Sequence, residues 1–382
     1  MFGNNVLGII FAYAHEERVR DLTELRVMAS VPFGGRYRLV DFTLSNMVNS
    51  GLNKVGIITE DNYQSLMDHL GSGKAWDLSR KREGLYLLPP FGKSTSRTDG
   101  KIESLDSIRR FLKNSLEEYV ILSDCDMVCN IDYREALEQH MRQNADITVI
   151  YRHGTSPDVD RNNIYMVDPE NRIRELLLHR GSEHGVNYGI GMYILSRELL
   201  LQLVEGCMSR NEYDFDKDMV QRVIPELRVM GYEFKGIAYQ ISSFEAYFNA
   251  NMGLMDPRVR AELFNPNRPI YTKVRDDMPA KYGLNSYATN CLVADGCVID
   301  GEVENCVLFR GVKIGKGAKV RNCVIMQDTV IGANSRLDYV VADKNVEIEE
   351  NRTLMAIRPT RCTLQRKARS NLPRKTKERK AV

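Results

Sequence analysis

Apolar residues recur six positions apart, with occasional slips, in the C-terminal third of the chain, and this spacing restricts the possible folds more than any other feature. The residues concerned are Val293, Ile299, Leu308, Ile314, Val320, Met326, Ile331 and Leu337. This pattern, with glycine corners, is typical of a parallel β-helix that points one aliphatic residue inward from each side of a coil. A β-sandwich would instead alternate with period two. We therefore expect a β-helix over residues 288–360, a domain type whose flat sides serve oligomer assembly.

The first 255 residues show a different pattern, in which short apolar runs alternate with segments of helical spacing. The runs that predict strands are 6–11, 55–59, 84–90, 119–124 and 146–151, and the segments that predict helices are 39–48, 64–70, 104–116 and 197–204. Such alternation favours a Rossmann-like α/β domain with a mostly parallel mixed sheet covered on both faces. We expect this domain at 1–255, a linker at 256–287, the β-helix, and a tail at 361–382.

The tail has a composition of its own. Nine of residues 361–382 are Lys or Arg and one is Glu, so the segment carries +8, while the net charge of the whole chain is +2. Few apolar residues and a proline predict a solvated, disordered segment. Binding of the tail to an anionic polymer is the alternative, and we do not expect nucleic acid to be a partner.

Cysteine usage and hydropathy bear on the cellular compartment. None of the eight cysteines forms a C-x-x-C pair and no His lies at metal-site spacing, so we expect reduced, mostly buried thiols and no zinc site. No apolar run approaches the ~20 residues of a membrane-spanning helix, and the N-terminus lacks the pattern of a signal peptide. The sequence predicts a cytoplasmic protein with no membrane partner.

Three further segments resemble one enzyme family. They are FGGRYRLVDFTLSNMVNSG (33–51), DFDKD (214–218) and FEAY (244–247). Together with the six-residue repeats, in this order, they are similar to the glucose-1-phosphate adenylyltransferases, or ADP-glucose pyrophosphorylases. Those enzymes make ADP-glucose and pyrophosphate from ATP and glucose 1-phosphate. The resemblance covers about residues 3–357, and it implies a nucleotidyltransferase domain followed by a left-handed β-helix.

The chain departs from the family where the triphosphate is bound. The family's Gly-Gly-x-Gly-x-Arg-Leu loop corresponds to residues 13–19, YAHEERV, which contain no glycine. Side chains keep the backbone away from a polyphosphate, and Glu16 and Glu17 add negative charge there. Arg18 is the one family cation retained in the loop, so we expect it to be a residual catalytic group at most. Met28 replaces a family Lys that faces the phosphates.

The metal site is altered as well. The predicted strand at 119–124 delivers Asp124 and Asp126 to its carboxyl end, and the resemblance implies that Asp126 is one of two carboxylates holding Mg²⁺. Gln240 stands where the family has the second carboxylate, and a neutral amide is a poor Mg²⁺ ligand. Asp126 is therefore the other residual catalytic candidate. We expect no firmly bound cofactor and a weakened Mg²⁺ site.

The sugar-phosphate site is matched in part. Leu178 and His179 stand where the family has a Glu-Lys pair, and His179 and the following Arg180 could still contact a phosphate group. Lys217, in the retained DFDKD segment, is the best candidate for such a contact, although a surface Lys between carboxylates is an equal alternative. The resemblance adds Asn187 to this site. Residues 100–104, GKIES, match the family's segment near the nucleobase only loosely.

Retained and altered segments together predict a function. Segments that shape the fold remain, whereas the phosphate loop, the Lys and one metal carboxylate have changed. This combination resembles the regulatory subunit of the enzyme family that Firmicute-type bacteria carry beside a catalytic subunit. We expect a non-catalytic or weakly catalytic subunit that joins a catalytic homologue in a heterotetramer and binds phosphorylated sugars. An active nucleotidyltransferase with an unusual phosphate loop and a stand-alone sugar-phosphate sensor are the alternatives.

Overall fold

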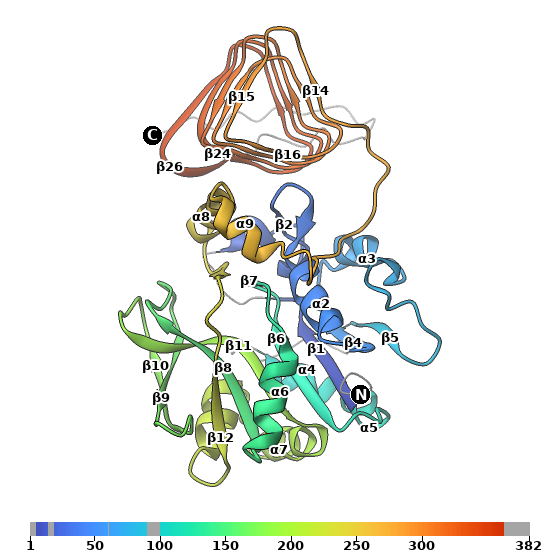
Figure 1. The fold of residues 1–382 in the computed structure, drawn as a ribbon, viewed down its shortest axis with the longest axis vertical. Coiled ribbons are helices and arrows are strands. Elements are labelled where there is room, and N and C mark those ends of the chain that lie inside the picture. The colour runs from blue at the N-terminus through green and yellow to red at the C-terminus, as the bar shows by residue number, and fades with distance from the viewer. Residues whose placement is uncertain (1–4, 14–18, 60, 90–99, 363–382) are drawn as a thin grey trace, which may run out of the picture. The chain divides into compact units, whose positions relative to one another are not determined.

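A computed structural model of the protein describes residues 5–13, 19–59, 61–89 and 100–362, and Figure 1 shows its fold. The chain divides into two compact units, Met1–Asp276 and Asp277–Val382. Arg18 and the tail beyond residue 362, which the sequence predicts to be disordered, lie outside the described residues. No helix within the described ranges is long and apolar enough to cross a membrane.

A nine-stranded mixed sheet forms the centre of the first unit. Its strands are β1 (Val6–Phe11), β4 (Lys54–Ile58), β5 (Gly84–Leu88), β6 (Tyr119–Asp124), β8 (Ile147–Gly154), β9 (Asn162–Val167), β10 (Ile173–His179), β11 (Val186–Ser196) and β12 (Val229–Glu233). Strands β5, β4, β1 and β6 run parallel to one another, whereas β11 is antiparallel to β6, β8 and β9. The predicted α/β domain with a mixed sheet is confirmed (Figure 1).

The first unit also contains helices. They are α1 (Arg20–Thr23), α2 (Leu39–Asn49), α3 (Gln64–Leu70), α4 (Lys101–Ser107), α5 (Arg109–Lys113), α6 (Tyr133–Arg142), α7 (Arg197–Ser209), α8 (Phe244–Gly253) and α9 (Pro257–Leu263). Of these, α4, α5, α6 and α7 pack against the sheet. The α9 helix lies within the range 256–287 proposed as a linker. The single helix predicted at 104–116 is two helices, α4 and α5, because the backbone of Ile108 leaves the helical region at φ −97°, ψ 12°.

Strand β1 shows why its sequence is a continuous apolar run. Leu7, Ile9 and Phe11 lie in the core cluster to which α4, α5 and α7 also contribute. Ile10, which points to the opposite face because side chains alternate along a strand, is buried as well. A strand covered on both faces needs apolar residues at every position.

Two small two-stranded sheets complete the first unit. In one, β2 (Pro32–Phe33) pairs with β3 (Tyr37–Arg38) through a turn in which Gly34 and Gly35 have φ of 59° and 85°. The Gly34 N–H donates to the side-chain oxygen of Asn251 over 3.0 Å, which joins this turn to α8. In the other, β7 (Met127–Cys129) pairs with β13 (Ala238–Gln240) in antiparallel register.

The second unit is a parallel β-helix. One side is formed by β14 (Lys281–Tyr282), β17 (Val298–Ile299), β20 (Lys313–Ile314), β23 (Val330–Ile331) and β25 (Glu347–Ile348). The other strands are β15 (Tyr287–Thr289), β16 (Leu292–Val293), β18 (Glu302–Glu304), β19 (Val307–Leu308), β21 (Lys319–Arg321), β22 (Val324–Ile325), β24 (Arg336–Ala342) and β26 (Thr353–Cys362). Inward residues stack in register, so Ile314 pairs with Ile331 and Ile331 with Ile348.

At one corner of the coil, successive inward residues are five positions apart and not six, as Val320 and Ile325 show. The sequence pattern predicts that Met326 points inward, but Ile325 holds that place in the core cluster of the β-helix. The corner is one residue shorter because Asn322 adopts a left-handed conformation with φ 48°, which asparagine tolerates better than most residues. Asn290 and Asn305 turn the same corner in earlier coils, with φ of 49° and 52°.

Candidate functional site

The two-stranded sheet of β7 and β13 brings together Asp126 and Gln240, the two positions at which the family resemblance implies metal carboxylates. Asp126 lies just before β7, and Gln240 ends β13 opposite Met127. The side-chain amide of Gln240 donates a hydrogen bond of 3.2 Å to Oδ2 of Asp126. The backbone N–H of Ile241 donates to the carbonyl oxygen of Asp126 over 2.8 Å. Residues far apart in the sequence are thus joined at the carboxyl end of β6.

A second polar pair, which the sequence did not predict, lies at the same end of the sheet. Asp124, the last residue of β6, pairs in register with Phe11 of β1. The ammonium group of Lys101, the first residue of α4, lies 2.8 Å from Oδ2 of Asp124. It also lies 5.5 Å from the ring centroid of Phe11 and 5.7 Å from that of Phe215, within the range of cation–π attraction.

Burial raises the pKa of Asp124 to about 6, against the lowering effect of Lys101. The carboxylates of Asp126 and Asp216 raise the pKa of Asp124 further, because they disfavour a third negative charge nearby. Gly191 of β11 covers the carboxyl group closely, since a Cβ atom at this position would lie 2.3 Å from Oδ2 of Asp124. The carboxyl group of Asp124 therefore lies in a confined space with two other carboxylates nearby.

The retained DFDKD segment lies beside this site as a turn of π-helix, Phe215–Gln221. Asp214 accepts hydrogen bonds from the guanidinium group of Arg161 and from the N–H of Lys217. Asp216 accepts a 2.6 Å hydrogen bond from the hydroxyl of Tyr193, and its carboxylate is 3.7 Å from Arg161. The side chain of Lys217 is exposed.

The other predicted sugar-phosphate residues lie on β10 and β11. His179 ends β10 and its Nε2 is 3.8 Å from a carboxylate oxygen of Glu183, while the neighbouring Arg180 is exposed. Asn187 of β11 meets His153 of β8, with 2.8 Å between its side-chain oxygen and the ring Nδ1. Asn187 thus shares β11 with Gly191, which covers Asp124. The binding roles of these residues remain predictions.

The loop that corresponds to the family's phosphate loop is described only at its two ends. Residues 14–18, including Arg18, lie outside the described residues. At the first end, the hydroxyl of Tyr13 donates a 2.8 Å hydrogen bond to Ser104 of α4. Met28, which the sequence resemblance aligns with a family Lys, is 1% exposed and packs as a core residue.

The donor groups at this site do not fit a Mg²⁺ ion. Mg²⁺ takes oxygen ligands in near-octahedral geometry, whereas Gln240 presents its N–H₂ group to Asp126 and Lys101 presents an ammonium group to Asp124. Within the described ranges, no group of three or more His, Cys, Asp or Glu side chains is arranged to hold a metal ion. We therefore assign no step through a metal ion to this chain.

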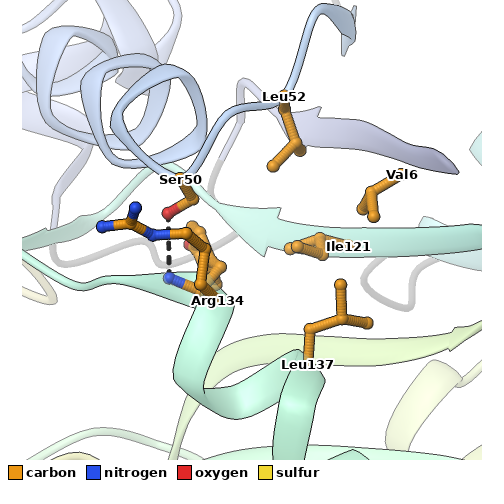
Figure 2. A pocket seen from close by; sticks show the side chains of 7 residues that line it. Val6, Ser50, Leu52, Ile121, Arg134 and Leu137 are labelled. Carbon is orange, nitrogen blue, oxygen red and sulfur yellow. Dashed lines mark hydrogen bonds between the residues drawn. The ribbon is translucent and has the colours of Figure 1, made fainter. Parts of the chain in front are cut away.

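A small cavity of about 10 Å³ lies elsewhere, near the amino end of β1, and Figure 2 shows its lining. It is lined by Val6, Ser50, Leu52, Ile121, Tyr133, Arg134 and Leu137. Ser50 accepts a hydrogen bond of 2.9 Å from the backbone N–H of Tyr133. The cavity has room for at most one water molecule, and it plays no part in the site at the carboxyl edge of the sheet.

Comparison with known proteins identifies both units. Residues 7–256 match the family model described as nucleotidyl transferase, and residues 278–355 match the GlmU-like, C-terminal hexapeptide model. The chain is 38% identical over 349 residues to the glycogen biosynthesis protein GlgD of Bacillus subtilis (strain 168), covering 91% of this chain and 92% of that protein. It is 39% identical to GlgD of Geobacillus stearothermophilus, covering 83% of each chain. It is 31% identical to the glucose-1-phosphate adenylyltransferase of that same species, covering 82% of this chain and 83% of the other.

Proposed function

Because this chain belongs to the glucose-1-phosphate adenylyltransferase family, we propose that it is a regulatory subunit in glycogen biosynthesis, assembled with a catalytic homologue that makes ADP-glucose. In this proposal the chain itself transfers adenylyl groups slowly or not at all. The tetrameric assembly, the binding of phosphorylated sugars and the effect on the partner's turnover are parts of the same proposal.

The observation that carries the proposal is the hydrogen bond between Gln240 and Asp126. Adenylyl transfer from ATP uses Mg²⁺ to neutralise charge on the phosphates. A pair of carboxylates can hold that ion, whereas an amide that donates its hydrogens to the one remaining carboxylate cannot. The ion pair between Lys101 and Asp124 supports the same conclusion, since it adds a fixed positive charge where the ion would bind.

The relatives support a division of labour between two chains. Geobacillus stearothermophilus has both a GlgD and a glucose-1-phosphate adenylyltransferase, and this chain is 39% identical to the first and 31% to the second. Two related chains in one organism, of which one retains catalysis, are the components that a hetero-oligomer needs. A partner can then change turnover by differential contacts with two states of the catalytic chain.

Lys217, His179, Arg180 and Asn187 are the candidates for contact with a phosphorylated sugar. Exposed cationic or imidazole groups at Lys217, His179 and Arg180 suit a phosphate group, and Asn187 can hydrogen-bond a sugar hydroxyl. We also place the protein in the cytoplasm, in keeping with the free thiols of buried residues such as Cys125 and Cys207, which a reducing compartment preserves.

The experiment is co-expression of this chain with a glucose-1-phosphate adenylyltransferase from its own organism. We expect a complex that is larger than either chain alone, and a higher rate of pyrophosphate release from Mg-ATP and glucose 1-phosphate than the catalytic chain gives by itself. Equal rates with and without this chain would refute the regulatory role. Pyrophosphate release by this chain alone, abolished by Asp126→Ala, would instead establish an active nucleotidyltransferase.

A further inference from the structure

The ammonium group of Lys101 supplies the positive charge closest to Asp124. Its Nζ lies 2.8 Å from Oδ2, and the two side chains are 13% and 19% exposed. The other carboxylate oxygen, Oδ1, is buried and accepts no hydrogen bond from the described part of the chain. Because the carboxylate of Asp124 is largely buried and one of its oxygens accepts no hydrogen bond, its negative charge is balanced by Lys101.

The surroundings hold the ammonium group in place. The rings of Phe11 and Phe215 flank it at 5.5 and 5.7 Å from their centroids. On the side of Asp124, Gly191 approaches so closely that even a methyl group would lie 2.3 Å from Oδ2. A hydrated metal ion needs several ligands around it, and this space already holds a side-chain cation, two aromatic rings and a stretch of backbone.

The second carboxylate, Asp126, is bonded in a way that also opposes a metal ion. Gln240 directs its N–H₂ group at Oδ2 of Asp126, and the N–H of Ile241 is bonded to the carbonyl oxygen of the same residue. The first contact brings a hydrogen-bond donor to the carboxylate of Asp126, whereas the second fixes only its backbone. A donor stabilises a carboxylate without supplying the oxygen that a divalent cation would require as a further ligand.

We infer that Lys101 is the resident cation of this site, and that its ammonium group takes the place of a divalent metal ion beside Asp124 and Asp126. The folded chain then binds no Mg²⁺ there. This inference deepens the proposed function and rests on it, because it explains how a site of this family keeps its charge balance without the metal ion. It also assigns a role to a residue for which the comparison of sequences offered only a loose match.

The test uses Mn²⁺ as the probe, with free Mn²⁺ measured by electron paramagnetic resonance in the presence of the full chain. Gln240→Asp restores a second carboxylate. Lys101→Met removes the charge at similar length, and Lys101→Arg is the matched control that keeps it. We expect no Mn²⁺ binding by the wild type or by Gln240→Asp/Lys101→Arg. Gln240→Asp/Lys101→Met should bind one Mn²⁺ at least about tenfold more tightly than Gln240→Asp alone.

Equal Mn²⁺ binding by Gln240→Asp with and without Lys101→Met would overturn the inference, as would a folded double variant that binds no Mn²⁺. If the double variant does not fold, Gln240→Asp alone decides: with Lys101 in place, Mn²⁺ should leave its melting temperature unchanged, and a clear rise would count against the resident cation. These results are independent of the co-expression experiment. If the wild-type chain stimulates its partner and also binds Mn²⁺, the resident cation is refuted while the regulatory role stands.

Discussion

Gln240 donates the hydrogen of its side-chain amide to the carboxylate of Asp126, over 3.2 Å and across 114 residues of sequence. An aspartate in place of Gln240 would oppose two negative charges at this separation. The glutamine replaces that repulsion with a hydrogen bond between a neutral donor and a charged acceptor, which is stronger than a bond between two neutral groups. Compared with an aspartate at this position, the glutamine therefore stabilises the folded chain.

Gln240→Asp should destabilise the first unit by about 1 to 2 kcal/mol at pH 7, because two facing carboxylates repel each other in a half-buried site. The loss should shrink as the pH falls through the range in which one carboxylate becomes protonated. Denaturant unfolding at several pH values measures it. Gln240→Ala, which removes the hydrogen bond without adding a charge, should cost less stability than Gln240→Asp at pH 7. A loss that is the same at every pH for Gln240→Asp would contradict the repulsion.

Gly191→Ala should destabilise the protein by about 2 to 5 kcal/mol. Roughly 1 to 2 kcal/mol comes from a left-handed backbone, here with φ 69°. A further ~1 to 3 kcal/mol comes from overpacking against Asp124. Gly185→Ala is the matched control, since Gly185 has the same φ of 69° and nothing within 4 Å of its added Cβ. Equal losses for the two variants, measured by chemical denaturation, would show that the contact with Asp124 has no energetic weight.

His140 should make the stability of the first unit depend on pH. Burial lowers the pKa of this imidazole from 6.5 to about 4. The unfolded chain therefore takes up the proton first as the pH falls, and stability present above about pH 6.5 is lost progressively down to about pH 4. The full effect is about 3 kcal/mol. His140→Asn should reduce the slope of unfolding free energy against pH in this range, and an unchanged slope would contradict the assignment.

Asn305 should stabilise the β-helix in two ways. It accepts a 2.7 Å hydrogen bond from Asn290 and donates one of 3.3 Å to Asn322, and it holds a left-handed corner with φ 52°. Asn305→Gly keeps the corner and should cost about 1 to 2 kcal/mol for the lost bonds. Asn305→Ala should cost roughly 1 to 2 kcal/mol more. Thermal unfolding measures both, and identical melting temperatures for the two variants would rule out a contribution from the backbone conformation.

Local patterns predicted most of the fold. The strand at 119–124 has the predicted bounds, and so does the helix at 64–70, because each depends on an apolar period within one segment. The six-residue spacing likewise predicted the β-helix and misplaced only Met326, since hydropathy does not distinguish Ile325 from its neighbour when both are buried. What separates them is the backbone conformation of Asn322.

The candidate site was predictable only where the family resemblance supplied a motif. Asp126 and Gln240 were paired on that basis, and the structure brings them into contact. The pairing of Lys101 with Asp124 had no comparable signal. Lys101 follows a glycine at the start of a helix and Asp124 ends an apolar strand, and nothing in their spacing shows that the two ends meet. Such a contact depends on how the helix packs across the sheet, which a single sequence does not encode in a local pattern.

The in-register stacking of the β-helix has a consequence for how this unit can change in length. Glu302 lies below Lys319 with 2.8 Å between their charged atoms, and Glu304 pairs with Arg321 at 3.2 Å, because each residue repeats its place one coil later. Removal of one whole coil would bring the next coil into the same contacts. Removal of a single residue from within a strand would turn the inward side chains of the rest of that strand outward. The domain can therefore change its height by complete coils, while small differences in coil length lie between the paired strands, as the spacings of 15 positions from Val298 to Lys313 and of 17 from Lys313 to Val330 show.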